Sequence, residues 1–529
     1  MTSKAVGMEY NLREISANKS VSFSDFSRGL IDFNFSIGAP QCFIPKKSYF
    51  KITLQLKGRY KDELKGLEPL KTADGIALAD DCAGSLFNNA YFRMSGQDVS
   101  VVNNYVAQAS ILKQRLGKSN AWSKSAGQSL TMLESDFAKR LSKTTFAPTL
   151  ENNKKVIVPV ADGVSAVTAV SVSRNARAVV GVGTTFQTIL RAQGCANLAD
   201  DTVKNASIVI EGRVFEIIEC TTETNLAVST TDDSKQEGKT DCYFICESPQ
   251  DGEAKSTLDI IYQPPLGIFD LSSMKMEDEV LTGDFRISLN PNTNYKSSVV
   301  ECLRKGVPSN AVTLVPADPI DPNFYDVQVV DIKFYACYCK MALPATITKQ
   351  LSLSEMMIMS KPLSGATNTY EFSVPSSTTS LAVWFQSSAT SNNPLYPASK
   401  FTMLDNKQNN LKAFQIMYAG QNLPSTKWTS SYGLTNNELV QRYRDNMSEN
   451  GHLYSGGGCE TLSDFLTRGL YILYTFTKDQ NDRSTQVQVS VDFSGAIETN
   501  ASIYLCAMYD KQTEYVVANG STVSIRQSN

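Results

Sequence analysis

Histidine is nearly absent from the sequence: His452 is the only one in 529 residues. Two-histidine zinc sites and the zinc-protease helix motif are therefore excluded. A single histidine can still complete a hydrolase triad, but His452 stands in the glycine-rich stretch ENGHLYSGGG, which has no nucleophile-elbow motif and no phosphate-loop lysine. We expect His452 to be an ordinary loop residue, and the sequence predicts no catalytic, cofactor-binding or metal-binding residue.

The eleven cysteines include no C-x-x-C motif, and their number is odd. The only close pairs are Cys242 with Cys246 and Cys337 with Cys339. The second pair lies in IKFYACYCK, where strand alternation would point both side chains to one face. We interpret the cysteines as buried, reduced side chains rather than zinc ligands or disulfides.

Long apolar runs and basic tails are also missing. No stretch is long and apolar enough for a membrane helix, and the start, MTSKAVGMEYNLREIS, lacks the apolar core of a signal peptide. The formal net charge is −3, and neither end carries an arm rich in lysine and arginine. We expect a soluble chain that is not exported by a signal peptide and has no direct nucleic-acid arm.

Alternation of apolar and polar residues with a period of two is the dominant pattern, and it predicts half-buried strands. Short strands separated by Gly, Pro, Asn and Ser turns indicate an all-β protein built from sandwiches or jelly rolls. The clearest alternating stretches are residues 31–37, 50–56, 285–289, 370–374 and 487–493.

Helical patterns are few. Residues 103–116 carry apolar residues at helical spacing, including Leu112 and Leu116. Residues 435–447 begin with a candidate capping box and predict a second helix. A short third helix is expected at 461–469, closed by its final glycine.

A weak internal repeat links the two halves of the chain. YFRMSGQDVSV (91–101) and FQIMYAGQNLPS (414–425) each place a Gly-Gln turn after an apolar strand. Each then leads to a predicted helix that carries a Gln-Arg pair, at Gln114 and at Gln441. The repeat predicts duplicated architecture.

Residues 150–256 interrupt this pattern with short β-segments and Gly, Thr and Ser turns. The stretch from GVGTTF to TNLAV resembles small β-barrel modules of phage tails and viral surface proteins, and the acidic region after it should be exposed. Four prolines in 303–324 indicate a linker. We expect a first jelly roll at 1–149 plus 257–310, an inserted β-barrel-like tower domain at 150–256, a linker at 311–324 and a second jelly roll at 325–529.

The stretch IIYQPPLGIF (260–269) is stiff, apolar and irregular. Pro264 and Pro265 should fix an extended path, while Gly267 should let the chain turn. We interpret the stretch as a structural clamp that packs, through residues such as Phe269, against the edge of a sandwich or against a neighbouring subunit.

Several stretches resemble the first jelly roll of double jelly-roll major capsid proteins of virophages, polinton-like viruses and the adenovirus-hexon lineage. They are QCFIPKKSYFKITLQL (41–56), AGSLFNNAYFRMSGQDV (83–99), IIYQPPLGIF (260–269) and LTGDFRISLNPN (281–292). The stretch AFQIMYAGQNLPS and the helix after it fit the second jelly roll.

This resemblance implies a viral structural protein without enzymatic activity. It implies a homotrimeric, pseudo-hexagonal capsomer that tiles an icosahedral shell around a DNA genome, after assembly inside the host cell. The expected partners are neighbouring capsomers, penton proteins and minor capsid proteins. Residues 150–256 would face outward from the virion, where a host receptor could bind.

Three alternatives stay open on the sequence alone. A viral spike, fibre or tail component with a host-attachment role would share the β-rich pattern. A carbohydrate-active enzyme would need paired carboxylates, but neither Asp492 with Glu498 nor the run Glu277–Glu279 is marked as a working pair. A secreted adhesin would use N-glycosylation sites, and the chain has six such motifs, at Asn18, Asn34, Asn205, Asn446, Asn500 and Asn519.

Overall fold

The computed structural model divides by internal contacts into two compact units, one of Met1–Thr145 with Ser256–Asn529 and one of Phe146–Lys255. The sequence placed the insertion at 150–256. The structure describes residues 10–19, 26–57, 76–122, 127, 155–159, 169–172, 178–182, 184–192, 206–210, 213–228, 236–239, 242–247, 256–271, 281–302, 326–340, 346–387, 397–401, 411–429, 436–452, 461–467, 469–476, 484–495, 497, 500–518 and 521–528.

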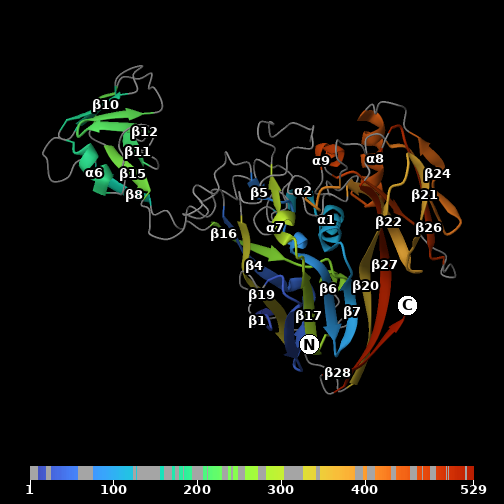
Figure 1. Ribbon diagram of the computed structural model, residues 1–529. Helices are drawn as coiled ribbons and strands as arrows, with labels where there is room; N and C mark the ends of the chain where they lie inside the picture. The colour runs from blue at the N-terminus through green and yellow to red at the C-terminus, as the bar shows by residue number, and fades with distance from the viewer. Residues whose placement is uncertain are drawn as a thin grey trace, which may run out of the picture. The chain divides into compact units, whose positions relative to one another are not determined.

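The first sandwich of the larger unit consists of two antiparallel sheets (Figure 1). One sheet has the order β1-β19-β4-β16, and β3 pairs with the end of β19. The other sheet has the order β2-β17-β6-β7, and a short β5–β18 pair lies apart. The strands are β1 (Tyr10–Ser16), β2 (Ile31–Ile37), β3 (Gln41–Phe43), β4 (Tyr49–Lys57), β5 (Ile76–Leu78), β6 (Phe87–Met94), β7 (Gln97–Val102), β16 (Ser256–Tyr262), β17 (Gly283–Pro291), β18 (Val300–Cys302) and β19 (Asp326–Lys340).

The second sandwich repeats this arrangement with the orders β20-β27-β22-β25 and β21-β26-β23-β24. A further strand, β28, continues the first of these sheets by pairing with the end of β27. The strands are β20 (Thr346–Pro362), β21 (Thr367–Ser373), β22 (Thr378–Ser387), β23 (Leu411–Tyr418), β24 (Gln421–Thr429), β25 (Tyr471–Thr475), β26 (Gln486–Phe493), β27 (Ala501–Ala518) and β28 (Ser521–Ser528).

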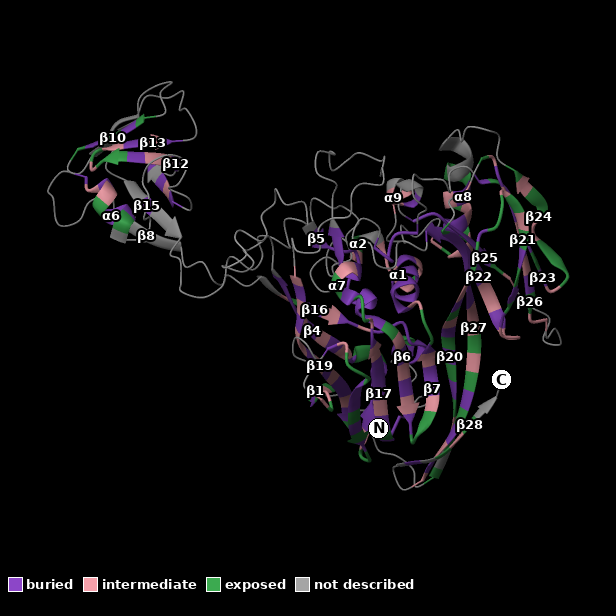
Figure 2. Ribbon diagram, in the orientation of Figure 1, coloured by how far each residue is buried: buried purple, intermediate pink, exposed green. Residues whose placement is uncertain are grey.

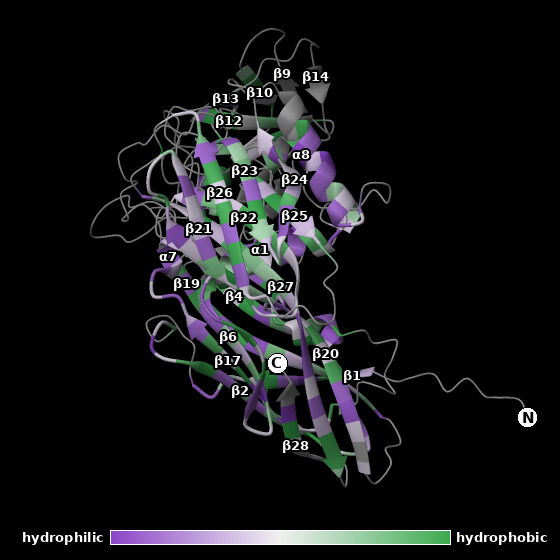
Figure 3. Cartoon of the chain, turned by 90° about the vertical axis from the view of Figure 1, so that its right-hand side faces the viewer, coloured by the Kyte–Doolittle hydropathy of each residue, from purple (hydrophilic) through white to green (hydrophobic). Residues whose placement is uncertain are grey.

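The two sandwiches have the same strand order. When the eight main strands of each are counted along the chain, the first, eighth, third and sixth form one sheet, and the second, seventh, fourth and fifth form the other. Eight antiparallel strands in two such sheets make a jelly roll. The alternation seen in the sequence explains each strand, because one side of every sheet faces a core; β26, for instance, alternates between hydrophilic and hydrophobic residues along its length (Figure 3).

The internal repeat of the sequence corresponds to two equivalent hairpins, β6–β7 and β23–β24. Each has a two-residue loop in which both residues have positive φ: Ser95 (48°) with Gly96 (81°), and Ala419 (50°) with Gly420 (72°). Two positive φ values define a type I′ turn, whose twist suits a tight hairpin and which favours glycine.

Replacing Gly96 by alanine is expected to cost about 1 kcal/mol of folding free energy, because a Cβ strains a residue held at φ 81°. Chemical denaturation of the full chain would measure this cost. The matched control is Gly495→Ala, since Gly495 has no positive φ and open space around its Cβ position. Equal stability of the two variants would contradict the role assigned to the turn.

The predicted helices form close to their expected places. The sequence anticipated α1 (Val106–Gly117) and α8 (Asn436–Glu449), and α9 (Leu462–Thr467) is capped by a reciprocal pair in which the amide of Asp464 donates to the Thr461 hydroxyl (3.2 Å). The other short helices of this unit are η2 (Pro45–Lys47), η4 (Gly84–Leu86), α2 (Asn120–Trp122), η6 (Gly267–Asp270) and α7 (Tyr295–Ser298). None of the helices described is both long and apolar enough to span a bilayer.

One domain boundary differs from the expectation. The sequence assigned everything from residue 325 onward to the second jelly roll, but Asp326–Lys340 forms β19 of the first, where it pairs with β4 and β1. The linker expected at 311–324 lies outside the described residues. The physical reason is register: β19 completes the first sheet by pairing from Asp326 with Lys57 to Tyr335 with Tyr49.

The two sandwiches share one buried core across the region where they meet, which we call the seam. The larger cluster of buried apolar residues includes Phe33 and Phe285 of the first sandwich together with Trp384 and Tyr515 of the second. A separate cluster fills the interior of the second sandwich. Figure 2 shows α1 mostly buried, because it lies in contact with both sandwiches.

The inserted unit contains one antiparallel path of strands with the order β14-β9-β10-β13-β12-β11-β15-β8, and a helix, α6, packs on it through Phe186. Among its described residues no pairing joins β14 to β8, so the β-barrel-like form expected from the sequence is not shown. Its elements are β8 (Lys155–Pro159), β9 (Ala169–Val172), β10 (Ala178–Val182), α6 (Phe186–Ala192), β11 (Ala206–Ile210), β12 (Arg213–Thr222), β13 (Asn225–Val228), β14 (Gln236–Lys239) and β15 (Cys242–Glu247).

Candidate functional site

The Pro-Pro segment, which the sequence marked as a clamp, connects β16 to η6 inside the larger unit. Leu266 and Ile268 are fully buried, and Phe269 is buried as well. All three belong to the core shared by the two sandwiches. The clamp therefore acts within one chain, and its apolar residues are not left for a neighbouring subunit.

Gly267 is required by close packing and not by a turn. A Cβ on this residue would lie 2.5 Å from the carbonyl oxygen of Ser354 and 3.0 Å from Oε1 of Glu355, both on β20. Its φ is not in the left-handed region, so the role expected from the sequence is corrected here. The absent side chain lets η6 lie directly against the second sandwich.

Polar contacts fix both ends of the Pro-Pro segment. The Lys113 ammonium group of α1 donates to the carbonyl of Leu266 (3.2 Å) and pairs with Asp270 at 2.7 Å. At the other end the Gln263 side chain donates to the carbonyl of Ser48 (2.6 Å). These contacts connect the segment to α1 and to the start of β4.

A buried polar network joins the sandwiches further along the seam. Lys400, from the connection between β22 and β23, forms an ion pair with Glu301 of β18, and both side chains are at least nine-tenths buried. The guanidinium group of Arg115 in α1 donates to the carbonyl of Ser399 (3.1 Å). The side-chain amide of Gln386 donates to the carbonyl of Lys400 (2.8 Å). Burial of a charge is costly unless it is paired, so this network holds the connection in one position.

Aromatic rings pack beside this network. Trp384 stacks between Phe401 (centroids 4.4 Å apart) and Tyr504 (5.5 Å). Tyr105, which precedes α1, meets Tyr504 edge-on and bonds Ser360 through its hydroxyl (2.7 Å). Stacked and edge-on pairs add about 0.5–1.5 kcal/mol each beyond the burial of their area.

His452 lies in the loop after α8, as the sequence predicted. Its backbone amide donates to Met447 (2.8 Å), and its ring Nε2 is 2.9 Å from the carbonyl of Leu116 at the end of α1. Asn450 donates to the same carbonyl (2.7 Å). The histidine therefore connects the two long helices and is a structural residue.

The asparagine of one glycosylation motif, Asn446, is buried and inaccessible. Asn446 of α8 is fully buried; its side chain donates to the carbonyl of Tyr471 (2.6 Å) and accepts from the amide of Leu473 (3.0 Å). These bonds attach α8 to the edge strand β25. A glycan on Asn446 is incompatible with this position, which argues against the adhesin alternative.

Cys337 and Cys339 point to one face of β19, as the alternation predicted, and they meet Cys42 and Ile44 in a small buried cluster. Burial raises the pKa of Cys42 to about 12, with a smaller contribution from Cys339, so its thiol is protonated at neutral pH. Within the described ranges no group of three or more His, Cys, Asp or Glu residues is arranged to hold a metal ion.

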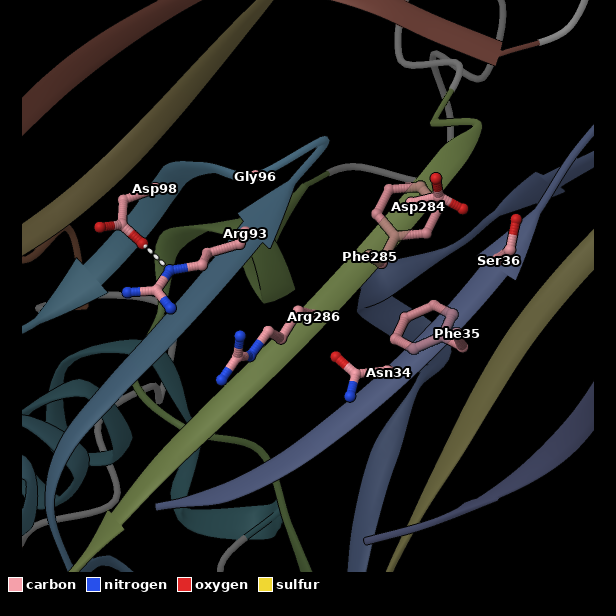
Figure 4. A pocket seen from close by; sticks show the side chains of 9 residues that line it. All are labelled: Asn34, Phe35, Ser36, Arg93, Gly96, Asp98, Asp284, Phe285 and Arg286. Atoms are coloured by element: carbon pink, nitrogen blue, oxygen red, sulfur yellow. Dashed lines mark hydrogen bonds and ion pairs between the residues drawn. The ribbon is translucent and has the colours of Figure 1, made fainter. Parts of the chain in front are cut away.

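A pocket of about 600 Å³ lies on the polar outer face of the sheet β2-β17-β6-β7 (Figure 4). Arg93 and Arg286 are direct cross-strand partners here, and each has its own acid: Arg93 pairs with Asp98 and Arg286 with Asp32, both at 2.5 Å. Like charges directly opposite one another repel, and these acids offset that repulsion. The matched charges suit a polar contact surface.

Of the carboxylates that the sequence offered as possible enzymatic pairs, the structure describes only Asp492. Asp492 lies on β26 and accepts a hydrogen bond from the Thr367 hydroxyl (2.6 Å). Glu498 and residues 277–279 lie outside the described residues. The buried charges of the seam were not predicted from the sequence, although a lone acid in the apolar run VVEC, at Glu301, could have indicated one of them.

No protein-family model matches the chain, and no curated protein matches it. Several solved structures are similar. A chain of the Sputnik virophage structure aligns with 100% of this chain and 90% of its own length, at 10% identity and a TM-score of 0.49. The mavirus major capsid protein covers 100% and 92%, at 13% identity and a TM-score of 0.45. The Faustovirus major capsid protein covers 97% and 91%, at 9% identity and a TM-score of 0.45.

Proposed function

We propose that this chain is the major capsid protein of an icosahedral DNA virus and that it forms pseudo-hexagonal homotrimeric capsomers. The observation that carries the proposal is the presence of two jelly rolls with identical strand order, joined through a common buried core. Such a unit presents the same sandwich topology twice in one chain. Three copies around an axis would present six similar sandwiches, which is a shape that tiles a surface.

The placement of the connections supports an upright orientation in a shell. The three longest connections of the first sandwich follow its third, fifth and seventh strands, and they begin after residues 57, 102 and 291. In an antiparallel jelly roll these connections leave from the same end, where β5, α2 and α7 gather in Figure 1. Insertions at such loops cost little, and the connection that begins after residue 102 contains the inserted unit.

The remaining assignments follow from this proposal. The chain would reside in the virion capsid after assembly inside the host cell, and penton and minor capsid proteins would complete the shell. The inserted unit at 150–256 would be the part available to a receptor. Because Arg93 and Arg286 on the outer sheet face are each paired with an acid, the chain would contact the genome through other components.

Negative-stain microscopy and light scattering of the purified full chain test the proposal. The expected result is a trimer with a pseudo-hexagonal outline, or shells built from such trimers. A stable monomer would contradict the proposal. An elongated rod would also contradict it and would favour a spike, fibre or tail component.

A further inference from the structure

Two buried carboxylic acids flank the Pro-Pro segment. Asp81 lies just before η4 beside Tyr262, and Glu355 of β20 lies against Gly267. Each is about 1% exposed. Neither belongs to the Lys400–Glu301 network, and the apolar packing of the segment does not by itself require an acid at either position.

Asp81 lies among buried polar groups, and its nearest polar neighbours are the hydroxyl groups of Ser110 and Tyr262. Both of its carboxyl oxygens, the Ser110 hydroxyl and the Tyr262 hydroxyl are buried, and none of them makes a bond of normal geometry. Burial raises the pKa of Asp81 to about 8; Ser110 lowers it in part, Asp80 raises it further and Arg115 lowers it slightly. An isolated buried carboxylate is costly, so the neutral acid is the form that suits this site.

Glu355 is in a similar position on the other side of the segment. Its Oε2 accepts a long hydrogen bond from the amide of Gly267 (3.4 Å). Its Oε1 is buried without a bond of normal geometry, and the Ser100 hydroxyl is its neighbour. Burial raises the pKa of Glu355 to about 7, against smaller opposing effects of Ser100, Gly267, Lys511 and Lys113.

The charged groups around Glu355 are committed elsewhere. Lys113 pairs with Asp270 at 2.7 Å, and Lys511 donates to the carbonyl of Val99 (2.8 Å). Neither lysine therefore neutralises Glu355 as a dedicated partner. The titratable groups that face Glu355 or these lysines are Lys113 of α1, Asp98 of β7, Asp270 of η6, and Tyr509 and Lys511 of β27.

We propose that Asp81 and Glu355 form a proton-dependent latch on residues 262–270. When both acids are protonated, the segment stays packed between α1 and the second sandwich. When they ionise, two carboxylates without a direct ion-pair partner are buried against it, and the seam between the sandwiches loosens. This device depends on the seam within one chain, so it holds whether or not the chain builds a shell.

The direction of the pH effect follows from proton binding. Both acids bind their protons more tightly in the folded chain than in the unfolded chain, whose ordinary pKa values are 4.5 for Glu and 3.8 for Asp. Their contribution to stability is fully present when the pH is below these unfolded-state pKa values. It is lost as the pH rises to the folded-state pKa, which is about 7 for Glu355 and about 8 for Asp81. Within these windows each acid changes the folding equilibrium by up to about tenfold per pH unit.

The test compares the full chain with Glu355→Gln and Asp81→Asn across pH 5 to 9, using denaturant midpoints. Relative to wild type, Glu355→Gln should gain stability as pH rises and level off near pH 7, while Asp81→Asn should level off near pH 8. Asp284→Asn, on the exposed outer face, is the matched control and should run parallel to wild type. Curves for the two buried-site variants that also run parallel to wild type would overturn the latch.

A measurement on the wild type alone covers the case in which a variant does not fold. Infrared spectroscopy should detect protonated carboxyl groups in the folded chain at pH 6 that are lost by pH 9. Over the same range, hydrogen exchange of residues 262–270, corrected for the intrinsic rate, should accelerate. Absence of a protonated carboxyl at pH 6, or unchanged exchange, would overturn the proposal.

Discussion

Gly267→Ala is expected to destabilise the larger unit by up to about 3 kcal/mol, at the upper end of the cost of overpacking a core. The added Cβ would lie 2.5 Å from a backbone oxygen of β20, a contact that no rotamer can relieve. Either η6 or β20 must shift, and both belong to the seam. Thermal unfolding of the full chain should show the loss as a lower melting temperature.

The control for this prediction is Gly117→Ala. Gly117 ends α1, has no neighbouring atom within 4 Å of its Cβ position and has no positive φ, so alanine should be tolerated there. A melting temperature of Gly267→Ala equal to that of Gly117→Ala would contradict the packing role. It would mean that the segment can move away from β20 without cost.

The strands and the duplication could be predicted from the sequence because their causes are local. Alternation with a period of two needs only a few residues to be visible, and it located strands such as β2 and β26 within two residues. The Gly-Gln motifs at Gly96 and Gly420 indicated two equivalent tight turns and a duplicated architecture, because both turns hold glycine at a positive φ.

The assignment of β19 could not be predicted in this way. Its alternation fits either sandwich equally well, and the proline-rich stretch before it indicates a boundary. Its partner β4 lies far earlier in the chain, at Tyr49–Lys57, and only their register identifies the sheet to which β19 belongs. Pairing over such a distance leaves no signal in a local window of sequence.

The buried charged residues between the two sandwiches could not be predicted either, because they depart from the usual rule that charged side chains are exposed. Glu355 stands in the stretch LSLSEMMIM and Glu301 in VVEC, and each is a lone acid among apolar residues. That pattern indicates that the acid is buried, but it does not identify the residue that pairs with it. The partner of Glu301 is Lys400, from another sandwich, and it becomes visible only in three dimensions.

Lys400→Met should be more damaging than any of the glycine substitutions, with a loss of about 3–5 kcal/mol of folding free energy. The substitution leaves Glu301 as a buried carboxylate without its cation, and this desolvation cost dominates. Denaturant unfolding at neutral pH would measure the loss. Lys333→Met is the matched control, because Lys333 pairs with Glu14 on the exposed face of the first sandwich. The free energy of unfolding of this variant should be close to that of the wild type.

The double variant Lys400→Met with Glu301→Leu separates two explanations for that loss. If the damage comes from the orphaned charge, removing both charges should restore much of the stability, because an apolar pair of similar volume is often as stable as a buried ion pair. The cycle of single and double variants would then show a large coupling energy between the two sites. If Lys400→Met costs no more than Lys333→Met, Glu301 finds another partner in the seam, and the ion pair does not hold the two sandwiches together.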